Sequence, residues 1–428
     1  MPEKKKMRPI TKFFIGAGVG TVIGLIFLLV VLGINGQLNF SSSNSQQATN
    51  MQPENTLSKE ENDSIVLREI KGEELLAAVQ DSETKKYGFI DTAGKYVISP
   101  IYEYACNFSE GLAFVQKDNK VGFINTKGEF AIELGNAISL KTDYSSDGIF
   151  TQEGVIPDYY SNEIFQEGLA AIAYVKTGDK YPMFKYIDKE GRTILDGYTF
   201  ADEFVDGIAL VATSRNNGWP ADFTYIDSTG KNIINKSFSS ASSFSEGYAC
   251  VGNEDNLFGY IDRTGNLVIP YQYKDASDFS EGYALVTKGD PIQDPRKGYE
   301  HLYMDSAYYI DTNGNRVIDE NFPQYVGTLN FSVFHDGVAS ALIDGKPGYI
   351  DKKGKVVLML PEIYSNTGIC FFPMIHGFAF VSDDNDMGYL IDNQGNQIVN
   401  NLIYNNEYPY FSYVDKSDDN MSSSKDGI

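Results

Sequence analysis

Acidic residues that stand directly before a glycine recur along this sequence, and their type and spacing come closest to a chemical function. If equivalent positions of a repeat align in space, such carboxylates form an electronegative rim that attracts cations or basic groups. The competing interpretation is structural, because an acid followed by glycine is typical of a solvated turn. Repetition favours the turn, since a repeat duplicates whatever its fold requires. The six acids are Glu110, Glu167, Asp206, Glu246, Glu281 and Asp336.

A second recurring pattern, Asp-x-x-Gly, invites comparison with calcium-binding loops. An EF-hand loop has glycine at its sixth position and a bidentate glutamate at its twelfth. In the best match, which starts at Asp311, glycine is the fourth residue (Gly314) and the twelfth is Phe322. The chain has three histidines and three cysteines, and no pair of them has metal-ligand spacing. We therefore predict hairpin turns, no metal site and no cofactor.

Motifs of covalent and phosphate chemistry are absent from the sequence. It contains no Gly-x-Ser-x-Gly elbow, no phosphate loop and no His-Glu-x-x-His. A glycosidase needs only two carboxylates at the right separation, but none of the 58 Asp and Glu residues stands apart as such a pair. We assign no catalytic residue, and a cell-envelope hydrolase of the β-propeller type is kept as an alternative function.

Two alternating motifs define the organisation of the chain. The first, Gly-Tyr/Phe-Ile-Asp-x-x-Gly, recurs about every 40 residues, which indicates a repeat architecture. The second, Phe-Ser-Glu-Gly-Leu-Ala, lies between copies of the first and contains the recurring acids. Alternating Val, Ile, Tyr and Phe predict three to four short strands per unit, joined by the Asp-x-x-Gly hairpin turn. The eight copies have their acid or amide at Asp91, Asn125, Asp188, Asp227, Asp262, Asp311, Asp351 and Asp392.

This double motif resembles the WG, or KWG, repeat family of bacterial proteins, in which Trp-Gly-Phe-Ile-Asp-x-x-Gly alternates with Phe-Ser-Glu-Gly-Leu-Ala. The resemblance covers roughly residues 72–410. The family's tryptophan is absent from every copy, and the single tryptophan, Trp219, lies in an insertion. The resemblance implies an architecture and no common activity. Before the glycine stand instead Tyr87, Val121, Phe258, Pro347 or Met387.

The predicted fold is an all-β array of about eight three- to four-stranded repeats over residues 64–415. One repeat cannot bury its apolar face alone, so neighbours must stack. Units of this size suit a β-propeller, whose ring leaves only short protected edges. An open β-solenoid is the alternative, because sequence does not measure closure.

One transmembrane helix is predicted before the repeats. Residues 13–34 are uncharged and mostly aliphatic, and as a helix they span about 33 Å, which matches a bilayer core. Five Lys and Arg within residues 1–12 predict a cytoplasmic N-terminus. A cleaved signal peptide is the alternative, although its apolar core is usually shorter. Gly16, Gly20 and Gly24 have the spacing of helix dimers in membranes, so a dimer is a further hypothesis.

The remaining segments are predicted to be polar and unstructured. Residues 35–63 are rich in Ser, Asn, Gln and Glu and cannot bury enough apolar surface to fold, so they form a flexible stalk. Residues 416–428 form a disordered tail of similar composition. The repeat domain is accordingly extracytoplasmic, on a single-pass protein of the cell membrane.

Charge and aromatic content lead to a functional hypothesis. The net charge is −23 although five basic residues cluster at the N-terminus, and this acidic body excludes nucleic acid as a partner. Recurring residues are explained by folding, so binding residues should lie in the insertions. We expect a binding or interaction protein of the bacterial cell surface, with a protein or cell-wall glycan as ligand, or else a sensory ectodomain. The candidate binding aromatics are Tyr159, Tyr160, Trp219 and Tyr299.

Overall fold

The computed structural model confirms an all-β repeat domain. It describes residues 75–139, 143, 149–157, 164–216, 218–288, 292–293, 302–303, 307–318, 333–343, 346–361, 373–382, 387–403 and 412–413. Within these ranges every regular element is a strand, and no helix has the length and apolarity needed to cross a membrane. The predicted span 13–34, the stalk 35–63 and the tail 416–428 lie outside the described residues.

The fifth repeat shows the complete unit. The short strand β16 (Ser240–Ala241) is followed by β17 (Tyr248–Gly252), β18 (Phe258–Asp262) and β19 (Leu267–Tyr273). Each strand pairs antiparallel with the next one. The recurring-acid turn lies between β16 and β17, and the Asp-x-x-Gly turn lies between β18 and β19. Both sequence motifs therefore occupy the reversals that were predicted for them.

Among the described residues, eight sheets of three to five strands correspond to the eight predicted repeats, and a two-stranded hairpin accompanies the sixth. In chain order the strands of the other sheets are β1 (Leu75–Gln80), β2 (Tyr87–Ile90) and β3 (Tyr96–Tyr102); β4 (Tyr104–Ala105), β5 (Ala113–Lys117), β6 (Lys120–Ile124) and β7 (Phe130–Asn136); β8 (Gly154–Val155), β9 (Phe165–Gln166), β10 (Leu169–Val175), β11 (Met183–Asp188) and β12 (Thr193–Tyr198); β13 (Phe200–Ala201), β14 (Ala209–Asn216) and β15 (Trp219–Ile226); β20 (Asp275–Ala276), β21 (Tyr283–Thr287) and β24 (Ala307–Asp311); β25 (Val338–Ile343), β26 (Lys346–Asp351) and β27 (Val356–Met359); and β28 (Phe378–Ser382), β29 (Met387–Asp392) and β30 (Gln397–Ile403). The hairpin is β22 (Ile292–Gln293) with β23 (Leu302–Tyr303), and β31 (Ser412–Tyr413) is the last strand.

The aspartates of the Asp-x-x-Gly turns, which suggested calcium binding, accept hydrogen bonds from the backbone of their own turns. In the fifth repeat, Oδ1 of Asp262 accepts hydrogen bonds from the backbone N–H groups of Thr264 and Asn266, at 2.9 and 3.0 Å. Gly265 closes the turn with a φ of 80°, a left-handed conformation that favours glycine. The hydrogen bond from the Thr264 hydroxyl is the main reason why the pKa of Asp262 lies below its ordinary value. These acids act as local turn formers.

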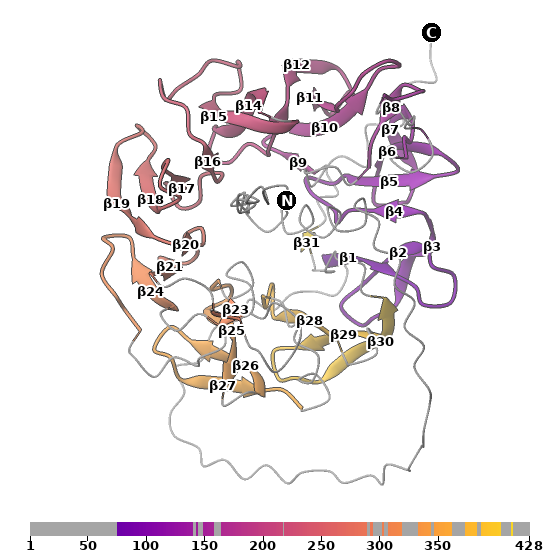
Figure 1. Ribbon diagram of the computed structural model, residues 1–428. Coiled ribbons are helices and arrows are strands. Elements are labelled where there is room, and N and C mark those ends of the chain that lie inside the picture. Colours follow the sequence, from indigo (N-terminus) through magenta and orange to yellow (C-terminus); the bar gives the residue numbers. More distant parts are fainter. Residues whose placement is uncertain are drawn as a thin grey trace, which may run out of the picture.

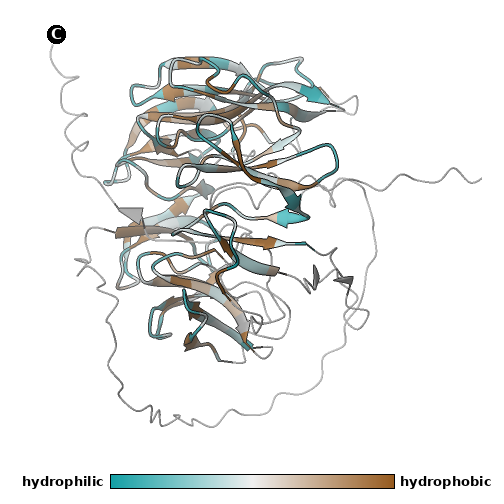
Figure 2. Ribbon diagram, turned by 90° about the vertical axis from the view of Figure 1, so that its left-hand side faces the viewer, coloured by the Kyte–Doolittle hydropathy of each residue, from teal (hydrophilic) through white to brown (hydrophobic). Residues whose placement is uncertain are grey.

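The sheets follow one another around a common centre, with the short strands β4, β9, β16 and β20 on the inner side (Figure 1). Apolar residues lie mainly within the strands and hydrophilic residues mainly at the turns (Figure 2). Consecutive sheets share core clusters. One cluster, for example, joins Phe184 and Tyr186 of the third sheet to Ala209 and Val211 of the fourth. The core is therefore divided among the sheet interfaces, as expected for units that cannot bury their faces alone.

The first and last sheets also pack against each other. Leu75, Val79 and Ile90 of the first sheet form one buried cluster with Phe380 and Leu390 of the last. In addition, β31 near the C-terminus pairs antiparallel with β1, which places it in the innermost position of the first sheet. The two ends of the repeat array thus meet.

Antiparallel alternation gives the ring two distinct ends. The recurring-acid turns and the Asp-x-x-Gly turns share one end, which we call the turn end. The hairpin tips between the strands equivalent to β17 and β18, and the connections from one repeat to the next, share the opposite end, which we call the hairpin end. Among the described residues, the segment 149–157 and the tip before Trp219 lie at the hairpin end.

Candidate functional site

The recurring acids adopt a left-handed backbone conformation. Their φ values lie between 50° and 54°, and the glycine after each one also has positive φ. Non-glycine residues rarely adopt this conformation, which costs about 1–2 kcal/mol. A compensating interaction is therefore expected at each turn. The acids are Glu110, Glu167, Asp206, Glu246, Glu281 and Asp336, and His376 occupies the same position in the eighth repeat with a φ of 53°.

The compensation is a hydrogen bond to the next repeat. In five of the six cases the carboxylate accepts from the backbone N–H of the glycine that follows the next recurring acid or its equivalent. The donor–acceptor pairs are Gly168 to Glu110 at 3.0 Å, Gly207 to Glu167 at 2.8 Å, Gly282 to Glu246 at 2.7 Å, Gly337 to Glu281 at 3.0 Å and Gly377 to Asp336 at 2.7 Å. The acids therefore staple neighbouring sheets together.

Two further contacts strengthen this junction. The serine before the acid donates to the phenylalanine carbonyl of the next repeat, as from Ser245 to Phe279 at 2.7 Å. At alternate junctions a cation from the next repeat reaches the acid: Lys352 Nζ lies 3.1 Å from a carboxylate oxygen of Glu281, and Arg263 binds Asp206. Among the described contacts, Asp206 is the acid bound by arginine rather than by a glycine N–H. At the turn end the recurring acids therefore connect neighbouring repeats and do not form an unoccupied electronegative rim.

The hairpin end carries the one candidate aromatic that the structure describes. Trp219 begins β15 at the tip of the β14–β15 hairpin, and 39% of it is exposed. Tyr159, Tyr160 and Tyr299 lie outside the described residues. In the sequence they belong to the insertions before β9 and between β22 and β23.

Residues next to Trp219 are tied to the third repeat through Arg215. The guanidinium of Arg215 donates to the carbonyl oxygens of Gly218 at 2.9 Å and Thr199 at 3.2 Å, and also to that of Pro182. Its Cζ lies 5.1 Å from the ring centroid of Tyr181. Gly218 has a φ of 91°, and a Cβ there would lie 3.0 Å from the hydroxyl oxygen of Tyr181. These contacts tie Arg215 and Gly218 to the third repeat, and 39% of Trp219 beside them is exposed.

The neighbouring insertion docks on the same end. Phe150 receives a backbone hydrogen bond from Gly178 at 2.9 Å and donates one to Asp179 at 2.8 Å, which ties the insertion to the β10–β11 tip. Its side chain is buried with Ile138, Ile156 and Val175 in a small apolar cluster. The non-recurring segments of the second to fourth repeats therefore form one continuous surface.

A buried polar cluster on the inner wall of the ring was not predicted from the sequence. Asp202 is 3% exposed and accepts hydrogen bonds from the Ser243 hydroxyl and from the N–H of Glu203. Asp278, in the sixth repeat, is hydrogen-bonded to the side chain of Ser242 in the fifth. These residues occupy the two variable positions of a recurring Ala-x-x-Phe frame, at 201–204, 241–244 and 276–279. The Ala and Phe of this frame recur, whereas the two residues between them differ from repeat to repeat. This variation is the sequence signal that could have indicated the cluster.

The environment of the inner-wall acids raises their pKa values. Burial raises the pKa of Asp278 to about 6, although its side-chain hydrogen bond with Ser242 lowers the pKa, and the nearby charge of Asp202 adds a smaller rise. Burial raises the pKa of Asp275 to about 6 as well. Oδ1 of Asp278 is enclosed and has no hydrogen-bond partner. No group of three or more His, Cys, Asp or Glu side chains in the described part of the chain could hold a metal ion.

These pKa values predict an unusual dependence of stability on pH. A carboxyl whose folded pKa is raised from 3.8 to about 6 binds more protons when folded, so its contribution to stability falls as pH rises from about 4 to 6. The loss above pH 6 amounts to at most about 3 kcal/mol for such a shift. We expect Asp278→Asn to melt at a higher temperature than the parent at pH 7, with the difference shrinking towards pH 4. An unchanged or lower melting temperature at pH 7 would contradict this reading of Asp278.

Comparison with known proteins gives one family match. Residues 87–120, 186–216, 223–256 and 258–290 match the family described as WG containing repeat. No curated protein matches the chain.

Solved structures match only distantly. The computationally designed Ika8 protein is 11% identical, with 69% of this chain and 85% of that chain covered and a TM-score of 0.41. BamB from Moraxella catarrhalis is 13% identical, with 73% and 91% covered and a TM-score of 0.41. A eukaryotic initiation factor is 13% identical, with 77% and 85% covered and a TM-score of 0.42.

Proposed function

Because the chain belongs to the WG-repeat proteins, whose repeats it uses to build a ring, we propose that it is a non-enzymatic binding protein with a β-propeller fold. Closure into a propeller is supported by the core cluster shared between the first and last sheets and by the pairing of β31 with β1. The partner is a protein or a cell-wall glycan of the bacterial envelope.

One observation carries the proposal: the recurring polar residues are used in folding, whereas the described non-recurring segments, residues 149–157 and the β10–β11 and β14–β15 tips, lie together at the hairpin end, where 39% of Trp219 is exposed. Aromatic side chains that are already ordered lose little entropy on binding, and they anchor many interfaces. Tryptophan also offers a flat apolar face on which a sugar ring or an apolar side chain can pack. The hairpin end is therefore the proposed binding surface.

The binding proposal predicts a specific loss in the Trp219→Ala variant. We expect its affinity for the partner to fall by about 2 kcal/mol, or roughly thirtyfold, as for a central aromatic anchor. Phe130→Ala is the matched control, because Phe130 is 38% exposed and begins β7 at the turn end. The measurement is retention of the full chain by isolated cell wall and by membrane-protein extract. Equal retention of both variants and the parent would remove Trp219 from the site.

The proposed location is the outer face of the cell membrane, with the chain anchored by residues 13–34 and dimerised through Gly16, Gly20 and Gly24. The sequence supports it through the apolar run and the basic residues before it. A cysteine at Ser43 should react with a membrane-impermeant thiol reagent on whole cells, and a cysteine at Pro2 should not. The reverse labelling pattern would overturn the orientation. Gly20→Ile should abolish a crosslinked dimer if the glycines mediate it.

A cell-envelope hydrolase is the second candidate, and the inner-wall acids are the observation that favours it. Asp278, with a pKa raised to about 6, lies close enough to Asp202 to be influenced by its charge, and a protonated and an ionised carboxyl form the catalytic pair of many glycosidases. The discriminating measurement is release of soluble sugar or peptide from cell-wall material. Release that disappears in Asp278→Asn would establish the hydrolase, whereas binding without release supports the binding protein.

A further inference from the structure

Histidines replace the recurring residues of the acid turn at one junction of the ring. In the second, fifth and sixth repeats a serine before the acid donates to the phenylalanine carbonyl of the next repeat. In the seventh repeat His335 takes the place of that serine, and in the eighth repeat His376 takes the place of the acid. Two of the three histidines of the chain therefore stand in consecutive copies of the same turn.

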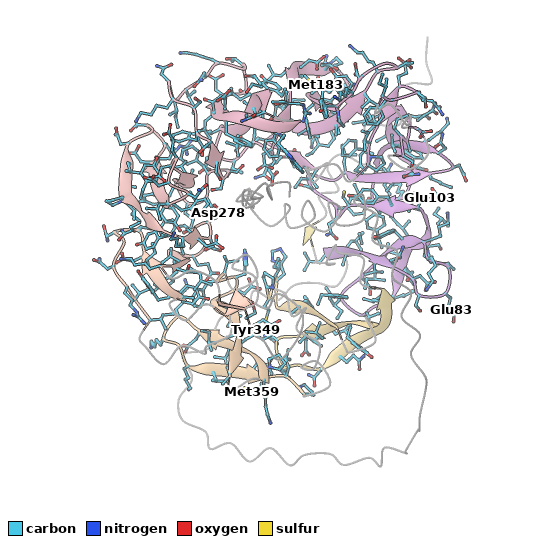
Figure 3. All side chains as sticks on the ribbon, in the orientation of Figure 1. Glu83, Glu103, Met183, Asp278, Tyr349 and Met359 are labelled. Atoms are coloured by element: carbon cyan, nitrogen blue, oxygen red, sulfur yellow. The ribbon has the colours of Figure 1, made fainter. Side chains whose placement is uncertain are left out.

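The two histidine-bearing turns are in direct contact. The N–H of Gly377, which follows one histidine, donates to Oδ2 of Asp336, which follows the other, at 2.7 Å. The core behind the turns is shared as well, because one buried cluster spans both sheets. It includes Val338, Met374 and Tyr349, the last of which is labelled in Figure 3. The histidines thus belong to the junction between the seventh and eighth sheets.

His335 is enclosed in this junction. Its Nε2 exposes essentially no surface and has no hydrogen-bond partner among the described residues. The backbone of the same residue exchanges two hydrogen bonds with Val338, at 2.9 and 3.0 Å. Water therefore reaches Nε2 only when the turn moves. An enclosed nitrogen without a partner costs more when the imidazole is charged than when it is neutral.

Both histidines are held in the neutral form. Burial lowers the pKa of His335 below its ordinary value, although the nearby carboxylates oppose the shift. Burial lowers the pKa of His376 too, against the charge of Asp336. The charged groups that act on His335 are Glu281, Asp336, Glu246 and His376, and Lys352 pairs with the first of them.

We propose that the junction between the seventh and eighth repeats is a pH-sensitive latch, which is closed while His335 and His376 are neutral and opens when they take up protons. The eighth sheet also packs on the first sheet, so this latch lies beside the place where the ring closes. Opening in mild acid would free one face of the last sheet. The latch is separate from the tryptophan surface at the hairpin end and does not depend on the proposed partner.

The direction of the pH effect follows from proton linkage. An opened turn returns each histidine to water, where it takes up a proton near pH 6.5. The stability that the neutral histidines contribute is therefore complete above pH 6.5 and is lost as the pH falls below it. The equilibrium constant for opening should rise by up to about tenfold per histidine for each pH unit, until the pH reaches the folded pKa.

Hydrogen exchange of the full-length protein, followed by mass spectrometry at pH 7.5 and 5.5, tests the latch. Exchange rates are corrected for their intrinsic dependence on pH, and protection reports local opening. We expect segments 335–343 and 376–382 to lose at least about tenfold more protection in acid than segments 245–252 and 280–287. The latter segments form the fifth–sixth junction, where serine and glutamate occupy the same positions.

Substitutions identify the titrating groups. The double variant His335→Ser with His376→Glu puts the recurring residues back and should abolish the additional loss of protection. His335→Gln removes one of the two titrating groups and should reduce it. His301→Gln changes the third histidine of the chain and should leave it unchanged. A melting curve at pH 7.5 establishes that each variant is folded.

Two results would overturn the proposal. The first is an equal loss of protection at the two junctions of the parent protein. The second is an undiminished difference between the junctions in folded His335→Gln and in the folded double variant, because another group would then carry the pH dependence. Asp275 and Asp278 titrate near pH 6 as well, so each variant is compared with the parent at the same pH, where their contribution cancels.

Discussion

Removal of residues 377–428 is expected to unfold most of the ring rather than only its last sheet. The last sheet covers both of its neighbours: Ala379 and Ile391 pack on Tyr349 of the seventh sheet, while Phe380 and Leu390 pack on the first sheet. Each large buried side chain that loses its partners costs about 2–5 kcal/mol. Several such losses exceed the 5–15 kcal/mol that usually separates folded from unfolded protein.

The truncation separates a closed ring from an open array. In an open array each repeat touches only its sequence neighbours, so the deletion would uncover one interface and leave the first six sheets stable. Thermal unfolding followed by circular dichroism is the measurement, and removal of only residues 416–428 is the control, expected to melt like the parent. A cooperative transition near the parental temperature after the longer deletion would rule out closure.

The second large effect, on the free energy of unfolding, is expected at Glu281, which contacts the next repeat through both a backbone N–H and a lysine. Both carboxylate oxygens accept from the N–H of Gly337, at 3.1 and 3.0 Å, and Lys352 binds the same side chain. Glu281→Ala removes these contacts and leaves a left-handed alanine. We expect a loss of about 1–3 kcal/mol in the free energy of unfolding, with partial exposure of the pair keeping the value towards the lower end.

A glycine at the same position divides the effect into its two causes. Glu281→Gly loses the same hydrogen bonds but relieves the left-handed backbone, so it should be more stable than Glu281→Ala by about 1 kcal/mol. Glu254→Ala, at an exposed hairpin tip, is the matched control and should be neutral. Denaturant unfolding measures all three variants. A neutral Glu281→Ala would mean that the carboxylate bridges do not hold the sheets together.

The fold was predicted from local sequence patterns. The all-β class and the Asp-x-x-Gly turns follow from strand alternation and from turn chemistry that operates within five residues, as at Asp262 to Asn266. Repetition then multiplied a weak local signal about eight times. The position of the insertions was also within reach of the sequence, because antiparallel strands place alternate turns at opposite ends.

Contacts between repeats could not be predicted from the sequence. The recurring acids were interpreted as solvated turns, but Glu167 binds the N–H of Gly207 in the next repeat. That bond depends on how neighbouring sheets stack, and no pattern within one repeat reveals it. The pairing of Asp202 with Ser243 is equally non-local. Trp219 was singled out from the sequence as non-recurring, but the contacts of the nearby Arg215 with Pro182, Thr199 and Gly218 required three segments to meet in space.

We propose that recurring residues build the ring and that non-recurring residues bind the envelope partner. One paired measurement tests it, namely melting temperature and retention by envelope material, recorded side by side for Trp219→Ala and Glu281→Ala in the full-length protein. The account predicts that Trp219→Ala melts like the parent and loses retention, while Glu281→Ala melts at a lower temperature and, below its transition, is retained like the parent. Loss of retention in folded Glu281→Ala together with full retention in Trp219→Ala would contradict it, because the turn end would then be the binding surface.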